Sequence, residues 1–172
     1  VDLVTTGDNS EGRAAETRPW REFSRQAQFY SVSLPLAQWL ALNVRHYDVV
    51  HIHALFSFPS IAAAMAARLS GVPYVIRPLG TLCRWGMLNR RPLLKRLSFR
   101  LLESRILAGA AAIHYTSEQE REEAAELGVT STGLVIGNPI EVPHNLTTLK
   151  GIFRTRYPQL EGRPIVLFLG RL

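Results

Sequence analysis

Short apolar runs rich in valine and isoleucine recur along the chain, and longer segments with helical spacing separate them. This alternation limits the fold most strongly, because buried strands joined by crossover helices form a parallel sheet. The sequence therefore predicts an α/β fold built from βα units. Strands are predicted over residues 1–6, 48–53, 73–77, 111–115, 133–136 and 165–169, with residues 29–32 as a weaker candidate.

Helix starts and stops support the same pattern. Gly71 and Gly128 stand where a left-handed residue ends a helix, and Ser117 followed by Glu120 forms a capping box. The polar residues 6–20 are predicted to form a surface loop. The segment 137–150, with two prolines and two asparagines, predicts a boundary between domains. Helices are predicted over residues 34–46, 59–70, 92–107, 117–127 and 149–160.

The composition fits a globular domain that buries a core. Of 172 residues, 47% are hydrophobic and 20% are charged, and the length suits one domain of ~150 residues plus a short remainder. No apolar run approaches the ~18 residues of a membrane-spanning helix. The chain begins inside a strand pattern without methionine and stops just after another, so we expect a fragment of a longer protein. The single cysteine, Cys83, excludes an intrachain disulfide framework and predicts a reducing, cytoplasmic setting.

Candidate ligand-binding residues follow the carboxyl ends of the predicted strands, where the loops and helix N-termini of an open parallel sheet converge. Gly80 lets a ligand approach the backbone, and the planar guanidinium of Arg171 suits a diphosphate. The patterns GxGxxG and GxxxxGK[ST] are absent, as are the HExxH zinc motif and the GxSxG nucleophile elbow. These absences count against a dehydrogenase, a P-loop ATPase and a zinc protease.

Two histidines and one serine each have a functional and a structural interpretation. His51 and His53 project to one face of a strand, as paired metal ligands would. No carboxylate or cysteine shares that strand face, so packed or cleft-edge histidines are favoured and no metal is predicted. Ser117 is explained by its capping role, and a contact with substrate is the less favoured alternative.

Residues 84–105 carry seven basic side chains against a single acidic one, and the whole chain has a net charge of +6. With leucines along one flank, this segment suits a helix on an anionic membrane surface. A helix that packs its leucines against the core and exposes its basic side chains to solvent explains this pattern equally well, so both interpretations stay open. Nucleic-acid binding is not predicted, because Trp85 and Phe99 are too few aromatics for base stacking. The candidate membrane contacts are Arg84, Arg90, Arg91, Lys95, Arg96 and Arg100.

Four motifs occur in a specific order: DVVHIHALFSFPSIAAAMAARLSGVPYVIRPLGTL, AAIHYTSEQE, VIGNPIEVP and IVLFLGRL. In this order they resemble the N-terminal half of family 4 glycosyltransferases, over residues 47–172. The resemblance implies a GT-B architecture, in which two Rossmann-like domains with doubly wound parallel sheets face each other across a cleft. Residues 1–143 would be the acceptor-binding domain, truncated at its start. Residues 144–172 would be the linker and the first strand of the nucleotide-sugar-binding domain.

The resemblance also implies site residues. The GRL motif places Gly170 and Arg171 at the donor diphosphate, and basic side chains there stand in for a bound metal, so no cofactor is expected. Leu79 stands where many relatives have a histidine, and GNPI stands where many have a PNG turn, so no catalytic residue is assigned. The residues expected to line the cleft are His53, Ser57, Gly80, Thr81, Ser117 and Asn138.

The leading hypothesis is a fragment of a glycosyltransferase that moves a hexose or another sugar from a nucleotide-sugar to a polysaccharide or lipid-linked saccharide. The fragment alone is expected to be inactive, because its donor site is incomplete. The expected location is the cytoplasm, with peripheral attachment to the inner face of the membrane through the basic segment as an option. The alternatives are a GT-B sugar-nucleotide epimerase and a basic nucleic-acid-binding module.

Overall fold

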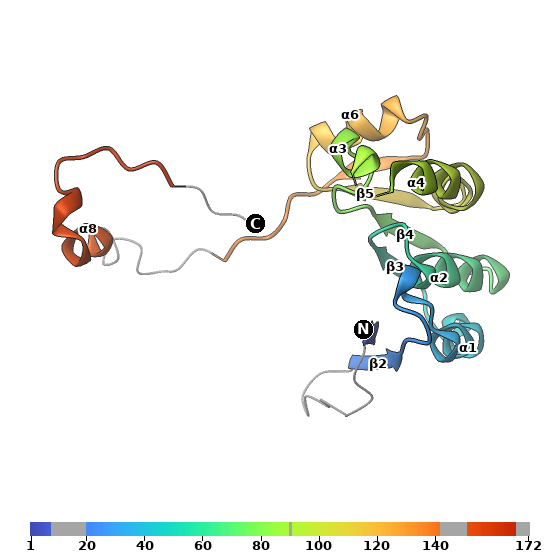
Figure 1. Ribbon diagram of the computed structural model, residues 1–172. Helices are drawn as coiled ribbons and strands as arrows, with labels where there is room; N and C mark the ends of the chain where they lie inside the picture. The colour runs from blue at the N-terminus through green and yellow to red at the C-terminus, as the bar shows by residue number, and fades with distance from the viewer. Residues whose placement is uncertain (8–19, 90, 142–150, 168–172) are drawn as a thin grey trace. The chain divides into compact units, whose positions relative to one another are not determined.

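A computed structural model describes residues 1–7, 20–89, 91–141 and 151–167 of the chain. Its contacts divide the chain into two compact units, Val1–Gly137 and Asn138–Leu172 (Figure 1). All the strands that the structure describes belong to the first unit. The domain limit expected at residue 143 lies within the proline- and asparagine-rich segment 137–150, and that limit stays a prediction.

The first unit holds two parallel sheets, which confirms the predicted Rossmann-like α/β class. Its strands are β1 (Leu3–Gly7), β2 (Trp20–Ser24), β3 (Val50–His53), β4 (Tyr74–Arg77), β5 (Ala112–Tyr115) and β6 (Gly133–Val135). β1 pairs with β2, and the other four strands form one sheet in the order β3-β4-β5-β6. β2 was not predicted from the sequence, because Arg21 and Glu22 interrupt its short apolar pattern.

One helix, α1 (Leu34–Asn43), leads from the smaller sheet to the larger one, and the other helices of this unit connect successive strands of the larger sheet. These are α2 (Phe58–Leu69), α3 (Arg84–Leu88), α4 (Pro92–Ser98), α5 (Ser104–Ala108) and α6 (Glu118–Glu126), with a π-helical turn over Phe99–Glu103 between α4 and α5. Ser33 caps α1, since its Oγ accepts a hydrogen bond from the Leu36 amide at 3.3 Å. Gly71 and Gly128 adopt φ values of +69° and +82° beyond α2 and α6, which confirms the predicted C-terminal glycines.

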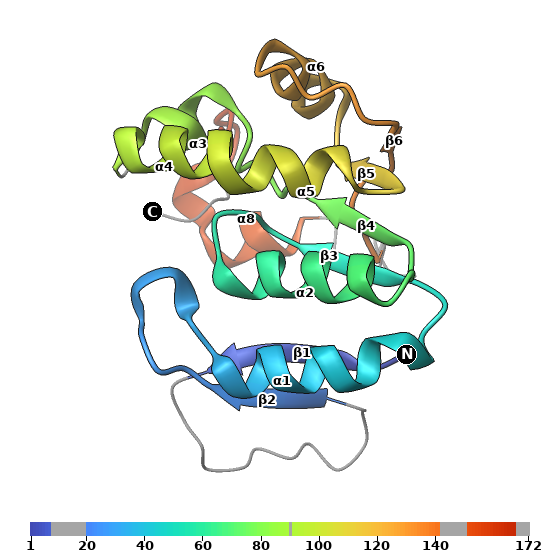
Figure 2. The ribbon, with the colours of Figure 1, turned by 90° about the vertical axis from the view of Figure 1, so that its right-hand side faces the viewer.

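The helices and the sheet bury their apolar sides against each other. Ile52, Ile76 and Ile113 sit in register on neighbouring strands and are almost fully buried. Leu36 and Ala64, from α1 and α2, belong to the same core cluster. Figure 1 shows α1, α2 and α4 on one side of the strands, and Figure 2 views this helical layer from the front. The side chains that alternate with the isoleucines therefore point to the opposite face of the sheet.

Residues 29–32, a weaker strand candidate, are instead a 3-10 helix over Phe29–Ser31. The prediction was wrong because Tyr30 takes a φ of +62°, which a strand does not accept. This conformation lets the Tyr30 hydroxyl donate a 2.5 Å hydrogen bond to the fully buried carboxylate of Glu103, which also accepts one from Ser98 at 2.9 Å. Burial and the neighbouring carboxylate raise the pKa of Tyr30. These hydrogen bonds connect the 3-10 turn at Phe29–Ser31 to the π-helical turn at Phe99–Glu103.

The second unit contains a short helix, α8 (Ile152–Arg156), and a 3-10 turn over Pro158–Leu160. Both lie within the predicted helix 149–160, and Pro158 separates them because proline lacks the amide hydrogen that a continuing helix needs. Of the strand predicted over 165–169, residues 165–167 have no regular secondary structure, and no strand pairs with them among the described residues. The loop predicted over residues 6–20 was wrong at both ends, because residues 6 and 7 belong to β1 and residue 20 begins β2. Its residues 8–19, and residues 168–169 of the predicted strand, lie outside the described residues.

Candidate functional site

The carboxyl ends of β3, β4 and β5 meet at one edge of the larger sheet, which is where open α/β sheets bind ligands. The backbone is strained at this edge. Ala54 and Phe56 after β3 have φ values of +67° and +56°, and Leu79 after β4 has +57°. Residues other than glycine adopt such angles at a cost of about 1–3 kcal/mol each. Residues strained in this way cluster at functional sites.

The loop after β3 is fixed by backbone and serine hydrogen bonds. The Ala54 amide donates to the carbonyl of Arg77 at 2.9 Å, which continues the pairing of β3 with β4. The Ser60 hydroxyl donates to the Ala54 carbonyl at 3.1 Å and lies 2.8 Å from the Ser57 hydroxyl. Ser57 therefore stands at the start of α2, and its hydroxyl contacts Ser60 rather than a helix amide. His53 and Ser57 both line a cavity of about 490 Å³.

The loop after β4 forms a closed turn. The carbonyl of Pro78 accepts hydrogen bonds from the amide and the hydroxyl of Thr81, at 3.3 and 2.7 Å. Gly80 has a φ of +73°, in the left-handed region that favours glycine. Gly86, in the middle of α3, approaches this turn closely: a Cβ atom there would lie 2.9 Å from the carbonyl oxygen of Gly80. The turn therefore packs closely against α3.

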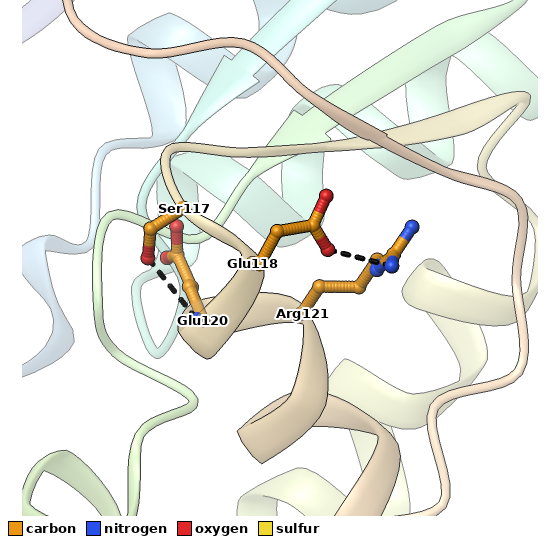
Figure 3. A network of polar contacts seen from close by, with 4 residues as sticks. All are labelled: Ser117, Glu118, Glu120 and Arg121. Carbon is orange, nitrogen blue, oxygen red and sulfur yellow. Dashed lines mark hydrogen bonds and ion pairs between the residues drawn. The ribbon is translucent and has the colours of Figure 1, made fainter.

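Glu120 ties the ends of β4 and β5 together, and sequence reasoning missed this role. Its carboxylate is almost fully buried and accepts hydrogen bonds from the Gly80 amide at 2.6 Å, the Thr116 amide at 2.7 Å and the Thr116 hydroxyl at 2.9 Å. The Glu120 amide donates to Ser117 Oγ at 3.2 Å, which confirms the predicted cap (Figure 3). The capping-box pattern predicts that Glu120 lies in the first turn of α6. The hydrogen bond from the Gly80 amide to Glu120 joins residues 40 positions apart, so no sequence pattern predicts it.

A cavity of about 330 Å³ opens beside this carboxylate. It brings Gly80 and Ser117 together, as expected for loops at one sheet edge, and adds side chains that the sequence did not single out. These are the exposed indole of Trp85, which is 73% exposed, and the carboxylate of Glu123. The lining residues are Gly80, Cys83, Trp85, Thr116, Ser117, Gln119, Glu120 and Glu123.

This lining suits a polyhydroxylated ligand better than a phosphate. Carboxylate and hydroxyl oxygens accept hydrogen bonds from ligand hydroxyl groups, while an indole offers an apolar face and one N–H donor. Two carboxylates, from Glu120 and Glu123, repel a phosphate. The remaining sequence candidates are elsewhere: Asn138 belongs to the second unit, and Gly170 and Arg171 lie outside the described residues.

Three histidines gather on the face of the sheet opposite the helices. The ring centroid of His51 lies 4.5 Å from that of His53 and 5.5 Å from that of His114. Burial lowers the pKa of His51 and of His53, and the neighbouring histidines and Arg77 lower it further. Within the described part of the chain, no group of three histidine, cysteine or acidic side chains is placed to hold a metal ion.

The basic segment exposes leucines as well as arginines. Leu93 on α4 is 79% exposed, and Leu97 and Leu101 are about half exposed. Ile106, just beyond the basic segment, is instead buried in the core. Lys95 has a structural role, since its ammonium donates to the carbonyls of Gly86 and Asn89 at 2.5 and 3.0 Å. Arg84, Arg91, Arg96 and Arg100 are exposed, and Arg90 lies outside the described residues.

The fold and this edge define a class: a parallel α/β domain with a candidate ligand site at its strand ends. A family model described as the glycosyl transferase 4-like domain matches residues 1–139. The chain therefore belongs to the glycosyl transferase 4-like domain family. No curated protein and no solved structure matches it. None of the helices that the structure describes is long and apolar enough to cross a membrane.

Proposed function

We propose that this chain is the acceptor-binding part of a glycosyltransferase that moves a sugar from a nucleotide-sugar to a polysaccharide or lipid-linked saccharide. Family membership supports sugar transfer in general. The observation that carries the choice of acceptor over donor is the lining of the cavity beside Gly80 and Ser117, where carboxylates and an indole meet. Family membership favours this function over an epimerase or a nucleic-acid-binding module.

The donor, in this proposal, is held by a second domain with help from Gly170 and Arg171. The guanidinium of Arg171 would pair with the diphosphate through its planar donors. A nucleotide-sugar is then the donor substrate, and no separate cofactor takes part. The 172 residues alone are expected to show no transfer, because the nucleotide would have too few contacts.

Trp85 provides the test of the acceptor site. In the polypeptide translated from the complete reading frame, we expect Trp85→Ala to raise the KM for the saccharide acceptor about tenfold and leave kcat unchanged. Leu69→Ala is the matched control, since Leu69 is 86% exposed and lies on α2. An unchanged acceptor KM in the Trp85 variant removes this cavity from the acceptor site.

We also propose that exposed leucines and arginines around α4 hold the protein on an anionic membrane surface, where a lipid-linked acceptor is found. Basic residues near such a surface contribute about 1 kcal/mol each, and exposed leucines add apolar burial. The arrangement explains why Leu93 and Leu97 face solvent instead of a core.

Vesicle sedimentation tests the membrane proposal. The protein should sediment with vesicles of phosphatidylglycerol at low salt and stay in solution with phosphatidylcholine. Arg96→Glu should weaken retention about fivefold or more, because it removes one attractive charge, worth about 1 kcal/mol, and adds a repulsive one. Leu93→Ser should weaken it as well, and Leu69→Ser on α2 should have no effect. Equal behaviour of both vesicle types would refute the proposal.

A further inference from the structure

Helix α3 carries Trp85 to the cavity beside Gly80, yet little of this helix packs into the core. It spans five residues, of which Met87 alone is buried, while Trp85 is 73% exposed and Leu88 is 50% exposed. Isolated helices shorter than about 12 residues are marginal in water. The position of the indole therefore depends on the contacts that hold the two ends of α3.

The first end of α3 is held by the residue before it and by α6. The Arg84 amide donates a hydrogen bond to the Glu123 carboxylate at 3.2 Å, and the Gly86 amide donates to the Cys83 sulfur at 3.1 Å. Both amides belong to the first turn of the helix, where backbone N–H groups lack acceptors within the helix. Side chains that line the cavity supply these acceptors.

The other end of α3 is held by one ammonium group. Lys95 extends from α4, which lies beside α3 (Figure 2), and its Nζ donates hydrogen bonds to the carbonyls of Gly86 and Asn89 at 2.5 and 3.0 Å. The last carbonyls of a helix lack donors within the helix, and lysine side chains can supply them. Hydrogen bonds from a charged donor are about twice as strong as neutral ones. Lys95 therefore restrains the end of α3 that follows Trp85.

Lys95 is itself placed by the loop after β3. Its Nζ lies 5.9 Å from the centre of the Phe56 ring, within the range of a cation–π contact. Phe56 is partly buried and packs against the core cluster, so this neighbour of the ammonium is anchored. The Lys95 side chain thus joins three elements, which are α4, the loop after β3 and the C-terminal end of α3.

The effect of Lys95 on the cavity passes through the backbone. The described residues that line the cavity do not include Lys95. Its ammonium binds the carbonyl of Gly86, the residue next to Trp85, and a Cβ atom on Gly86 would lie 2.9 Å from the Gly80 carbonyl oxygen. A shift of α3 would therefore move the indole and disturb the turn at Gly80 together.

We infer that Lys95 is a positioning residue for the acceptor, because it holds α3 so that the Trp85 indole faces the bound saccharide. The inference rests on the proposed function, since it requires that this cavity binds the acceptor. It gives Lys95 a role different from the membrane contact that the basic segment suggests. An ammonium that is bonded to two carbonyls is not free to pair with lipid phosphates.

Steady-state kinetics with a water-soluble saccharide acceptor tests this role in the polypeptide from the complete reading frame. If loss of the restraint leaves the indole in place about one fifth of the time, Lys95→Met raises the acceptor KM about fivefold, because apparent affinity falls with the competent fraction. The kcat and the KM for the nucleotide-sugar should not change. Lys95→Arg keeps a charged donor and should stay within about twofold of the original acceptor KM. Arg68→Met is the matched control, since Arg68 is an exposed cation on α2.

A double-mutant cycle shows whether Lys95 acts through the indole. In a Trp85→Ala background, Lys95→Met should raise the acceptor KM no further, because the group that it positions is absent. Additive effects overturn the inference. If Trp85→Ala raises the acceptor KM and Lys95→Met alone does not, only this inference fails. If Trp85→Ala itself leaves that KM unchanged, the proposed acceptor site fails, and this inference fails with it.

Fluorine NMR of the protein labelled with 5-fluorotryptophan measures the restraint without turnover. Trp85→Phe identifies the resonance of Trp85. Lys95→Met should move this resonance toward its position in the unfolded protein, whereas Arg68→Met should not. The resonance of Trp39, on α1, should stay in place and shows that the variant is folded. A Trp85 resonance that does not move in Lys95→Met overturns the inference.

Discussion

Replacing Glu120 with glutamine tests whether one carboxylate holds the candidate site together. The carboxylate accepts hydrogen bonds from the amides of Gly80 and Thr116, which lie after different strands. A glutamine amide can present its oxygen to one of these donors, and its NH2 group then faces the other. Glu120→Gln therefore keeps the size of the side chain and removes the acceptor from one strand end.

The expected loss of stability follows from the bonds involved. A hydrogen bond to a charged group contributes about 1.5–3 kcal/mol, and a buried donor left without a partner costs about 1–3 kcal/mol. We therefore expect Glu120→Gln to lower the free energy of unfolding by about 3 kcal/mol, which corresponds to about 6–12 °C in Tm for a chain of this size.

Urea unfolding followed by circular dichroism measures this loss. Glu122→Gln is the matched control, because Glu122 lies on the same helix and is exposed, and it should change stability by less than about 0.5 kcal/mol. The exchange rate of the Gly80 amide should also rise in the Glu120 variant alone. A stability change below about 1 kcal/mol in Glu120→Gln would show that the carboxylate does not carry the connection.

Two further predictions concern the backbone and the histidines. Gly80→Ala should lower stability by about 1–2 kcal/mol in thermal unfolding, because Gly80 has a φ of +73°, whereas Gly137→Ala should change little, since its φ is not in that region. Burial lowers the pKa of His51 and His53 below 6.5, so the unfolded state binds more protons and stability falls as pH drops through that value. The double variant His51→Asn, His53→Asn should lose stability less steeply between about pH 7 and pH 5, and an identical slope would contradict this.

The parallel sheet could be predicted because its signals are local. Ile52, Ile76 and Ile113 lie at the centres of short apolar runs, and the structure buries all three in register. The glycines at 71 and 128 mark helix ends through a backbone conformation that glycine adopts at little cost.

The missed features depend on contacts between distant residues. Tyr30 leaves the strand conformation because its hydroxyl bonds to Glu103, which is 73 residues away. β2 exists because β1 offers an edge, although its own residues alternate poorly. Such partners become neighbours only after the sheet has formed, so no spacing in the sequence indicates them.

The candidate site was predicted in part. The strand ends at Gly80 and Ser117 were expected to meet, because parallel strands bring their carboxyl ends to one edge, and they line one cavity. Trp85 and Glu123 reach that cavity from α3 and α6 through packing that sequence alone does not determine. His53 and Ser57 line a different cavity, whose lining includes residues of β1 and β3.

The most direct test of sugar transfer uses the polypeptide from the complete reading frame. It is incubated with a panel of nucleotide-sugars labelled in the sugar, together with saccharide and lipid extracts of the source cells. We predict that label from one donor enters a saccharide or lipid fraction, with release of the nucleoside diphosphate, and that Trp85→Ala reduces this at limiting acceptor. Label that stays in an epimerised nucleotide-sugar, or that enters no acceptor from any donor, would contradict the account.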